Sequence, residues 1–225
     1  EGQTLEQWIL DQEEPDLTAI RNIVSQVVSG LRAFHRLDML HQDIKPGNIM
    51  MTPEGIVKIV DFGSTKIAGI AEIATPVERK ELLGTRHYTA PEYLIGNPGT
   101  NRSDMFSLAC IVYEMITGRL PYSDQLEKVS GEADFQRLNY LSISNYMQTI
   151  PHWVDKAIKK AVQINPEKRY EKLSEFESDL RKPNPEFLKE EQLPLMERNP
   201  LGFWKGLALM LLVLNFVLLF FITTN

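Results

Sequence analysis

Apolar residues recur every three or four positions along much of the chain, and this spacing predicts amphipathic helices. One helix is expected to begin at Asp16 or Thr18, either of which can cap it, and another to run from Pro151 to Asn165. The apolar stripe of the first consists of Ile20, Ile23, Val24, Val27, Val28, Leu31 and Phe34, and that of the second of Val154, Ile158, Ala161 and Val162. Each helix is therefore expected to bury one face.

A third predicted helix, from Asp104 to Thr117, is apolar on nearly every side. A helix without a polar face is normally buried, so we expect this one to be buried in the fold. Gly118 follows it as a typical helix end. A last helix is predicted from Ser174, whose spacing to Glu177 fits a capping box, to about Leu180.

A short β-hairpin is predicted between these helices. The apolar runs 49–51 and 56–60 flank Thr52-Pro53-Glu54-Gly55, a typical turn, and the hairpin would carry Asp61 back beside Asn48. Residues 64–89 lack a clear period and are predicted to form a loop, and 123–148 to form loops with one or two short helices. The predicted fold class is mostly α with a small β-hairpin.

Composition narrows the class of protein. A chain of 225 residues usually holds one or two domains. The net charge of −6 argues against a nucleic-acid-binding surface, because binding to phosphates needs a concentrated basic face. The single cysteine, Cys110, excludes an internal disulfide framework and fits a reducing, cytosolic setting.

The C-terminal part of the chain changes in character after Lys182. Residues 183–200 combine four prolines with charges of both signs, which indicates a Pro-rich linker. The run from Gly206 to Ile222 is apolar except for Asn215, and counted from Leu201 it is long enough to cross a bilayer. We therefore expect a transmembrane helix over 201–222, with a buried hydrophobic helix as the alternative.

Three motifs follow one another in the chain. His41, Asp43, Lys45 and Asn48 form a His-x-Asp-x-Lys-x-x-Asn pattern, which is followed by Asp-Phe-Gly at 61–63 and Ala-Pro-Glu at 90–92. Their chemistry is a base, a phosphate-binding cation and two metal ligands, as phosphoryl transfer requires. In order and separation the motifs resemble those of the protein kinase family.

The resemblance implies a role for each of the polar residues. Asp43 would accept a proton from a substrate hydroxyl, and Lys45 would offset charge on the transferring phosphoryl group of ATP. Asn48 and Asp61 would bind Mg²⁺. Lys45 and Thr85 match the Ser/Thr-specific branch of the family.

Other matching residues would support the site. His41 would be a scaffold residue, Gly63 would permit the turn after the metal ligand, and Asp104 would bond the backbone of the catalytic loop. Glu92 and Arg169 would form a buried ion pair that holds the substrate loop. His35, His87 and His152 have no partners at metal-ligand spacing.

Position 42 departs from the pattern. Many kinases carry an Arg there that pairs with a phosphorylated activation loop, and Gln42 cannot supply that charge. We therefore hypothesise that loop phosphorylation is not the main switch.

The resemblance covers residues 1–182 and only the larger, C-terminal lobe of a kinase. No Gly-x-Gly-x-x-Gly loop and no Val-Ala-x-Lys strand occurs in the sequence, so we expect the small lobe to precede Glu1 and this fragment to be inactive without it. A kinase lobe, a Pro-rich linker and a C-terminal anchor also resemble bacterial kinases fused behind a metal-dependent phosphatase domain.

The expected function is a protein Ser/Thr kinase that uses ATP and Mg²⁺ to phosphorylate a protein hydroxyl. A single C-terminal span would hold its catalytic part at the cytoplasmic face of a membrane. Two alternatives remain: a pseudokinase or docking module tethered to the membrane, and a tail-anchored scaffold whose kinase-like lobe only binds partners.

Overall fold

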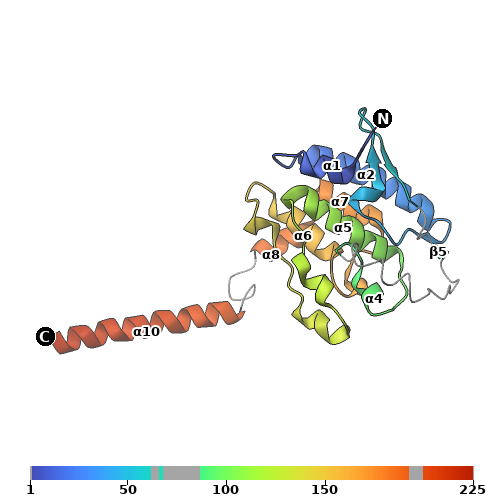
Figure 1. Cartoon of the computed structure of the whole chain (residues 1–225). Helices are drawn as coiled ribbons and strands as arrows, with labels where there is room; N and C mark the ends of the chain where they lie inside the picture. Colours follow the sequence, from blue (N-terminus) through green and yellow to red (C-terminus); the bar gives the residue numbers. More distant parts are fainter. Residues whose placement is uncertain (1, 62–65, 68–86, 193–199, 225) are drawn as a thin grey trace. The chain divides into compact units, whose positions relative to one another are not determined.

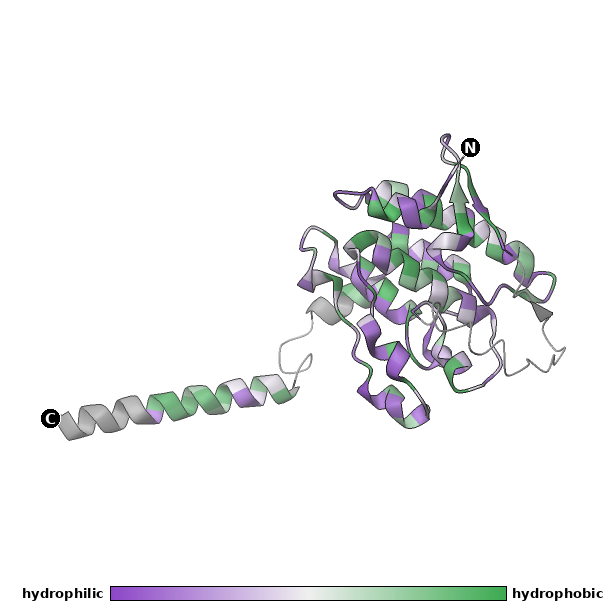
Figure 2. Ribbon diagram, viewed as in Figure 1, coloured by the Kyte–Doolittle hydropathy of each residue, from purple (hydrophilic) through white to green (hydrophobic). Residues whose placement is uncertain are grey.

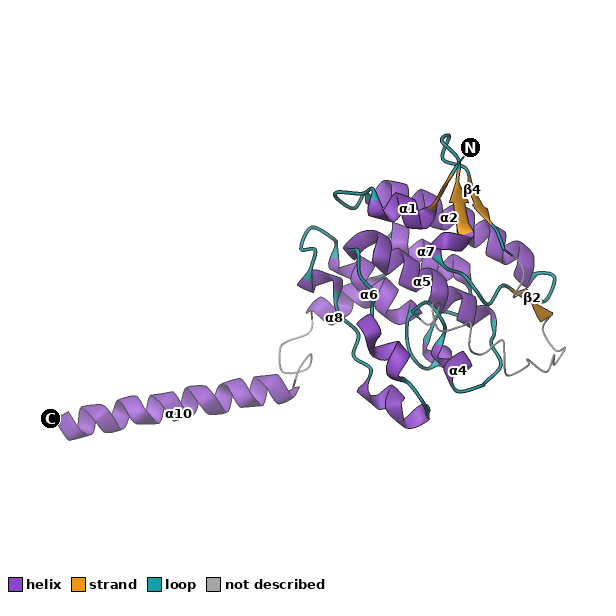
Figure 3. Ribbon diagram, viewed as in Figure 1, coloured by secondary structure: helices purple, strands orange, loops and turns teal. Residues whose placement is uncertain are grey.

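The computed structural model describes residues 2–61, 66–67, 87–192 and 200–224, without the side chains of 66–67, 189–192, 200 and 216–224 (Figure 1). Contacts between Cα atoms divide the chain into two units, Glu1–Lys182 and Pro183–Asn225. Most of the described elements are helices, as the sequence predicts (Figure 3).

The predicted hairpin is confirmed. Strands β3 (Ile49–Met51) and β4 (Val57–Ile59) pair antiparallel, with Ile49 opposite Ile59. Strand β1 (Gln3–Thr4) pairs with the other edge of β3 and extends the hairpin to three strands. A separate two-stranded sheet joins β2 (Met39–Leu40) to β5 (Lys66–Ile67).

Helices form the rest of the first unit. The α-helices are α1 (Leu5–Leu10), α2 (Leu17–His35), α4 (Pro91–Leu94), α5 (Asn101–Thr117), α6 (His152–Ala161) and α7 (Leu173–Arg181). The 3₁₀ helices are η1 (Pro46–Asn48), η3 (Ser123–Lys128), η4 (Glu132–Arg137), η5 (Ile143–Asn145) and η6 (Pro166–Lys168).

Helix α2 begins and packs as its pattern predicts. The side chain of Asp16 accepts hydrogen bonds from the backbone N–H groups of Thr18 and Ala19, which makes Asp16 the cap. Every member of the predicted stripe from Ile20 to Leu31 is buried. This face packs against α5, α7 and β4.

Helix α5 is buried on almost all sides, and it contacts both α2 and α6. It begins earlier than predicted, because the side chain of Thr100 accepts from the backbone N–H of Arg102 and Ser103 bonds back to Thr100. Gly118 ends it with a φ of 64°, a left-handed conformation that favours glycine. Asp104 therefore lies inside the first turn rather than at the cap.

Two further helix boundaries differ from the sequence predictions. Helix α6 ends at Ala161, well before Asn165. The capping box predicted at Ser174 is wrong, because Lys172 is the cap residue of α7 and its side chain makes no capping bond. The Glu175 carboxylate instead accepts from the backbone N–H of Glu171.

The second unit contains helices α8 (Pro185–Gln192) and α10 (Pro200–Thr224). Helix α8 lies within the stretch predicted to be a linker. It begins at Pro185 because the Asn184 side chain accepts from the backbone N–H of Glu186 and because proline is well suited to the first helical position.

The coloured residues of α10 are mostly apolar (Figure 2), and many of the large ones are exposed. Within the residues that the structure describes, no helix has both the length and the apolar character needed to cross a membrane. The transmembrane helix over 201–222 is thus not shown and stays a prediction.

Candidate active site

The segment that runs from the end of β2 through η1 gathers three of the predicted site residues. The Lys45 Nζ donates to Asp43 Oδ2 at 2.7 Å, and the Asn48 Nδ2 donates to the same oxygen at 2.9 Å. The Asn48 amide also donates to the backbone carbonyl of Asp43 at 2.8 Å. The Asp43 carboxylate is therefore held in place by two side chains from its own loop.

The hairpin brings Asp61 next to this loop. The backbone N–H of Val60 donates to the carbonyl of Asn48 at 2.9 Å, so the residues that flank the two strands lie side by side. Asp61 follows Val60 with a φ of 60°. The predicted effect of the hairpin is thus present in the structure.

The residues present fit a magnesium ion. Asn48 uses its amide nitrogen to hold Asp43, and this leaves its side-chain oxygen available as a ligand. The carboxylate of Asp61 is a second hard oxygen donor of the kind that Mg²⁺ prefers. No group of three or more His, Cys, Asp or Glu side chains suited to a metal occurs among the described residues, so phosphate and water oxygens would have to complete the coordination.

The Asp104 carboxylate on α5 binds the backbone of the loop directly before Asp43. Its Oδ2 accepts from the backbone N–H of His41 and its Oδ1 from that of Gln42, both at 3.0 Å. The His35 Nε2 lies 2.9 Å from Asp104 Oδ2. The loop contact is the one that the kinase resemblance implies, whereas His35 was not predicted as part of the site. A histidine in the last turn of the helix before the loop was the only signal for it.

His41 is fully buried beside the ring of Phe34, at 6.0 Å between ring centroids. Burial lowers the pKa of His41, although the carboxylates of Asp104 and Asp43 act in the opposite direction. A buried, neutral imidazole is consistent with a scaffold residue.

Glu92 and Arg169 form a buried ion pair with two parallel hydrogen bonds, each of 2.8 Å. Burial alone would raise the pKa of Glu92, but the hydrogen bond and charge of Arg169 bring it below its usual value. The pair connects the start of α4 to the segment before α7. The structure thus brings together the two residues that the sequence matched.

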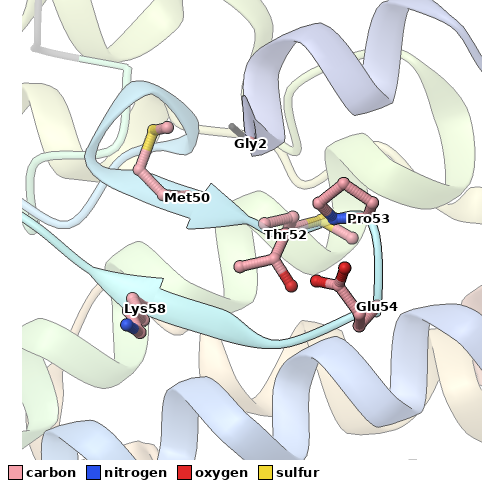
Figure 4. A pocket seen from close by; sticks show the side chains of 7 residues that line it. Gly2, Met50, Thr52, Pro53, Glu54 and Lys58 are labelled. Carbon is pink, nitrogen blue, oxygen red and sulfur yellow. The ribbon is translucent and has the colours of Figure 1, made fainter.

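Two predicted residues, Gly63 and Thr85, lie outside the described residues, as does most of the predicted loop over 64–89. A hollow of about 270 Å³ occurs at the end of the hairpin, where Met50, Thr52, Pro53, Glu54 and Lys58 surround it (Figure 4). Because it contains no residue of the catalytic loop, we do not assign the reaction to it.

The comparisons with known proteins agree with this geometry. The model of the protein kinase domain matches residues 1–179. The serine/threonine-protein kinase PrkC of Bacillus subtilis is 31% identical over 181 residues, which are 80% of this chain and 27% of PrkC. The serine/threonine-protein kinase PknB of Mycobacterium leprae is 32% identical over 181 residues, which are 80% of this chain and 28% of PknB.

A third relative is more similar over a shorter stretch. The serine/threonine-protein kinase PknA of Corynebacterium glutamicum is 44% identical over 103 residues, or 45% of this chain and 21% of PknA. The chain thus spans only about a quarter of the length of these curated relatives. With most of its length matched by the family model and its loop residues in place, the chain belongs to the protein kinase domain family.

Proposed function

We propose that the full-length protein is a Ser/Thr protein kinase that transfers the terminal phosphate of ATP to a protein hydroxyl. The observation that carries the proposal is the Asp43 carboxylate, which Lys45 and Asn48 hold in place while the hairpin brings Asp61 alongside. Asn48 and Asp61 would hold the magnesium ion. Magnesium-bound ATP supplies the phosphoryl group when it is present.

Asp43, Lys45 and Asn48 each have a different role in the proposed reaction. Asp43 accepts the proton of the acceptor hydroxyl while the new oxygen–phosphorus bond forms and the bond to ADP breaks. The Lys45 ammonium, 2.7 Å from this carboxylate, is close enough to offset negative charge on the transferring group. The Asn48 amide orients the carboxylate throughout.

Phosphate transfer from labelled ATP by the full-length protein tests the proposal. Asp43→Asn is expected to lower the rate by about 10²- to 10⁴-fold, the usual contribution of a general base. Asp38→Asn is the matched control, since Asp38 is exposed, belongs to the preceding turn and has a φ of 54° that asparagine tolerates. Equal incorporation in wild type and Asp43→Asn would contradict the mechanism and favour a docking module.

We also propose that residues 201–222 anchor the catalytic part to a membrane, with that part in the cytoplasm. The support is the apolar run in the sequence, interrupted only by Lys205 and Asn215 among strongly polar side chains, and the helical backbone of α10. Full-length protein is expected in the membrane fraction after a carbonate wash, and a variant that ends at Pro200 in the soluble fraction. The same distribution for both would refute the anchor. A phosphatase domain in the same full-length chain stays an expectation that the sequence upstream of Glu1 would test.

A further inference from the structure

The apolar run 206–222 of α10 contains one strongly polar residue, Asn215, whose side chain is exposed. Its Nδ2 donates to the backbone carbonyl of Leu211, one turn earlier, at 2.9 Å. A side-chain amide has two N–H donors and a carbonyl oxygen that can accept two hydrogen bonds. Within the part of the chain that the structure describes, this bond leaves one N–H and the carbonyl oxygen of Asn215 without a partner.

In the proposed anchor, this amide would lie deep in the bilayer. The midpoint of residues 201–222 falls between positions 211 and 212, so at a rise of about 1.5 Å per residue Asn215 is about 5 Å from the bilayer centre. The hydrocarbon core is about 30 Å thick, which leaves the amide about 10 Å from the nearer interface. An asparagine side chain is too short to reach water from there, and an unpaired amide in hydrocarbon is costly.

The sequence of α10 offers no second partner for the amide. Lys205 lies ten residues before Asn215 and Thr223 eight residues after it, which are about 15 and 12 Å along the helix axis. The backbone N–H groups inside a helix are already used by the helix itself. The missing hydrogen bonds therefore have to come from another molecule in the bilayer.

A second copy of this helix has the matching chemistry at the matching depth. Two copies of one chain enter the membrane with the same orientation, so their Asn215 residues lie at the same level. An amide is self-complementary, since each copy can donate its remaining N–H to the carbonyl oxygen of the other across a twofold axis. Interhelical hydrogen bonds of this kind help to hold membrane helices together.

The face of α10 that carries Asn215 has the spacing of a helix pair. Leu201, Trp204, Ala208 and Leu211 precede Asn215 at alternating intervals of three and four residues, as on the contact face of a left-handed pair, and all four are exposed. Ala208, seven residues before Asn215, is small enough for two backbones to approach closely.

We propose that α10 pairs in the bilayer with α10 of a second copy of this chain, through hydrogen bonds between the two Asn215 amides. The inference rests on the proposed membrane anchor. A single polar residue on an apolar contact face also fixes the register of the two helices. Asn215 thus determines that the copies pair level with each other.

The test uses full-length protein with a donor or an acceptor dye at its C-terminus, in vesicles of phosphatidylethanolamine and phosphatidylglycerol. Energy transfer in the wild type is expected to fall as lipid is added, which gives a dissociation constant. Asn215→Leu should raise this constant about 3- to 30-fold, the range of interhelical polar bonds. Asn215→Gln should keep the association, because its amide has the same donors and acceptors.

Val213→Leu is the matched control. Val213 lies about 200° around the helix from Asn215, so the variant changes an apolar side chain on the opposite face and should behave as the wild type. Absence of energy transfer in the wild type at every dilution would overturn the proposal. An unchanged constant in Asn215→Leu, an equal loss in Val213→Leu, or a loss in Asn215→Gln as large as that in Asn215→Leu would also overturn it.

Flotation of the vesicles separates this inference from the anchor on which it rests. Wild-type protein that does not float with the vesicles would refute the anchor and the pairing together. Protein that floats but shows the same dissociation constant with and without Asn215 would refute the pairing alone.

Discussion

The Arg169 guanidinium donates five hydrogen bonds in the interior of the fold, and replacing Arg169 tests the packing of the buried ion pair. Besides its two bonds to Glu92, it donates to the carbonyls of Gln163, Arg102 and Ile164 at 2.6, 2.9 and 3.1 Å. Its side chain is fully buried, and the Glu92 side chain is 7% exposed. Removing the guanidinium therefore leaves one carboxylate and three carbonyl groups to be satisfied in the interior.

The two members of the pair should not be equivalent. Arg169→Met is expected to lower the free energy of unfolding by about 3–5 kcal/mol, the usual cost of leaving a partner charge buried. Glu92→Gln should cost only about 1.5–3 kcal/mol, because its amide oxygen can still accept from Arg169 and the three carbonyl contacts remain. The double variant should cost less than the sum of the single changes, since no unpaired charge is left.

Urea unfolding of the purified protein measures these differences through the midpoint at unchanged m-value. In a domain of this size, 3–5 kcal/mol corresponds to a fall in melting temperature of about 6–20 °C. Two results would refute the reasoning that Arg169→Met leaves the buried Glu92 charge uncompensated. One is a loss in the free energy of unfolding below about 1 kcal/mol in Arg169→Met, and the other is a double variant less stable than the sum of the single changes predicts.

The same pair gives a dependence on pH. A carboxyl whose pKa is lower in the folded than in the unfolded state stabilises the fold above its unfolded value and loses that contribution on acidification. For Glu92, whose ordinary value is 4.5, the loss should occur as pH falls below about 4.5 and through the lowered folded pKa. Glu92→Gln should lack this part of the acid transition in a pH series of unfolding midpoints.

Two further predictions concern the catalytic loop. Burial lowers the pKa of His41 from 6.5, so the unfolded chain binds the proton more readily than the folded one, and unfolding midpoints should fall as pH drops below about 6.5. His41→Leu should make the midpoints depend less on pH. An equal pH dependence in wild type and His41→Leu would contradict this prediction. Gln42 carries no charge to pair with a phosphate, so replacing Thr65, Thr75 and Thr89 together by Ala should leave most of the phosphate transfer in a labelled-ATP assay. Loss of transfer in the folded full-length protein would refute the hypothesis that loop phosphorylation is not the main switch.

The sequence predicted those features of the fold that are determined by residues close together in the chain. The cap at Asp16, the buried stripe of α2 and the stop at Gly118 each follow from residues within a turn or two. The hairpin turn likewise placed Asn48 and Asp61 together, because only a short run separates them. The pairing of Glu92 with Arg169 came from family resemblance alone.

Contacts between distant residues explain what the sequence did not predict. His35 and Asp104 are 69 positions apart, and His87, whose Nε2 lies 2.9 Å from Glu127 Oε1, belongs like Glu127 to a segment without a clear period. The early start of α5 shows the competition between alternative caps, since Thr100 and Asp104 are both suitable by type. Thr100 is the cap because Ser103 can bond back to it, and this choice leaves Asp104 free to bind the loop.

That choice of cap has a consequence for the catalytic loop. Gln42 has a φ of 69°, a left-handed conformation that costs a non-glycine residue roughly 1–2 kcal/mol. The Asp104 carboxylate accepts from the backbone N–H of Gln42 itself and from that of His41 before it, and each bond to a charged acceptor contributes about 1.5–3 kcal/mol. The strain directly before Asp43 is therefore offset from the buried helix α5, so the conformation of the reacting loop is determined by a residue that never meets the substrate.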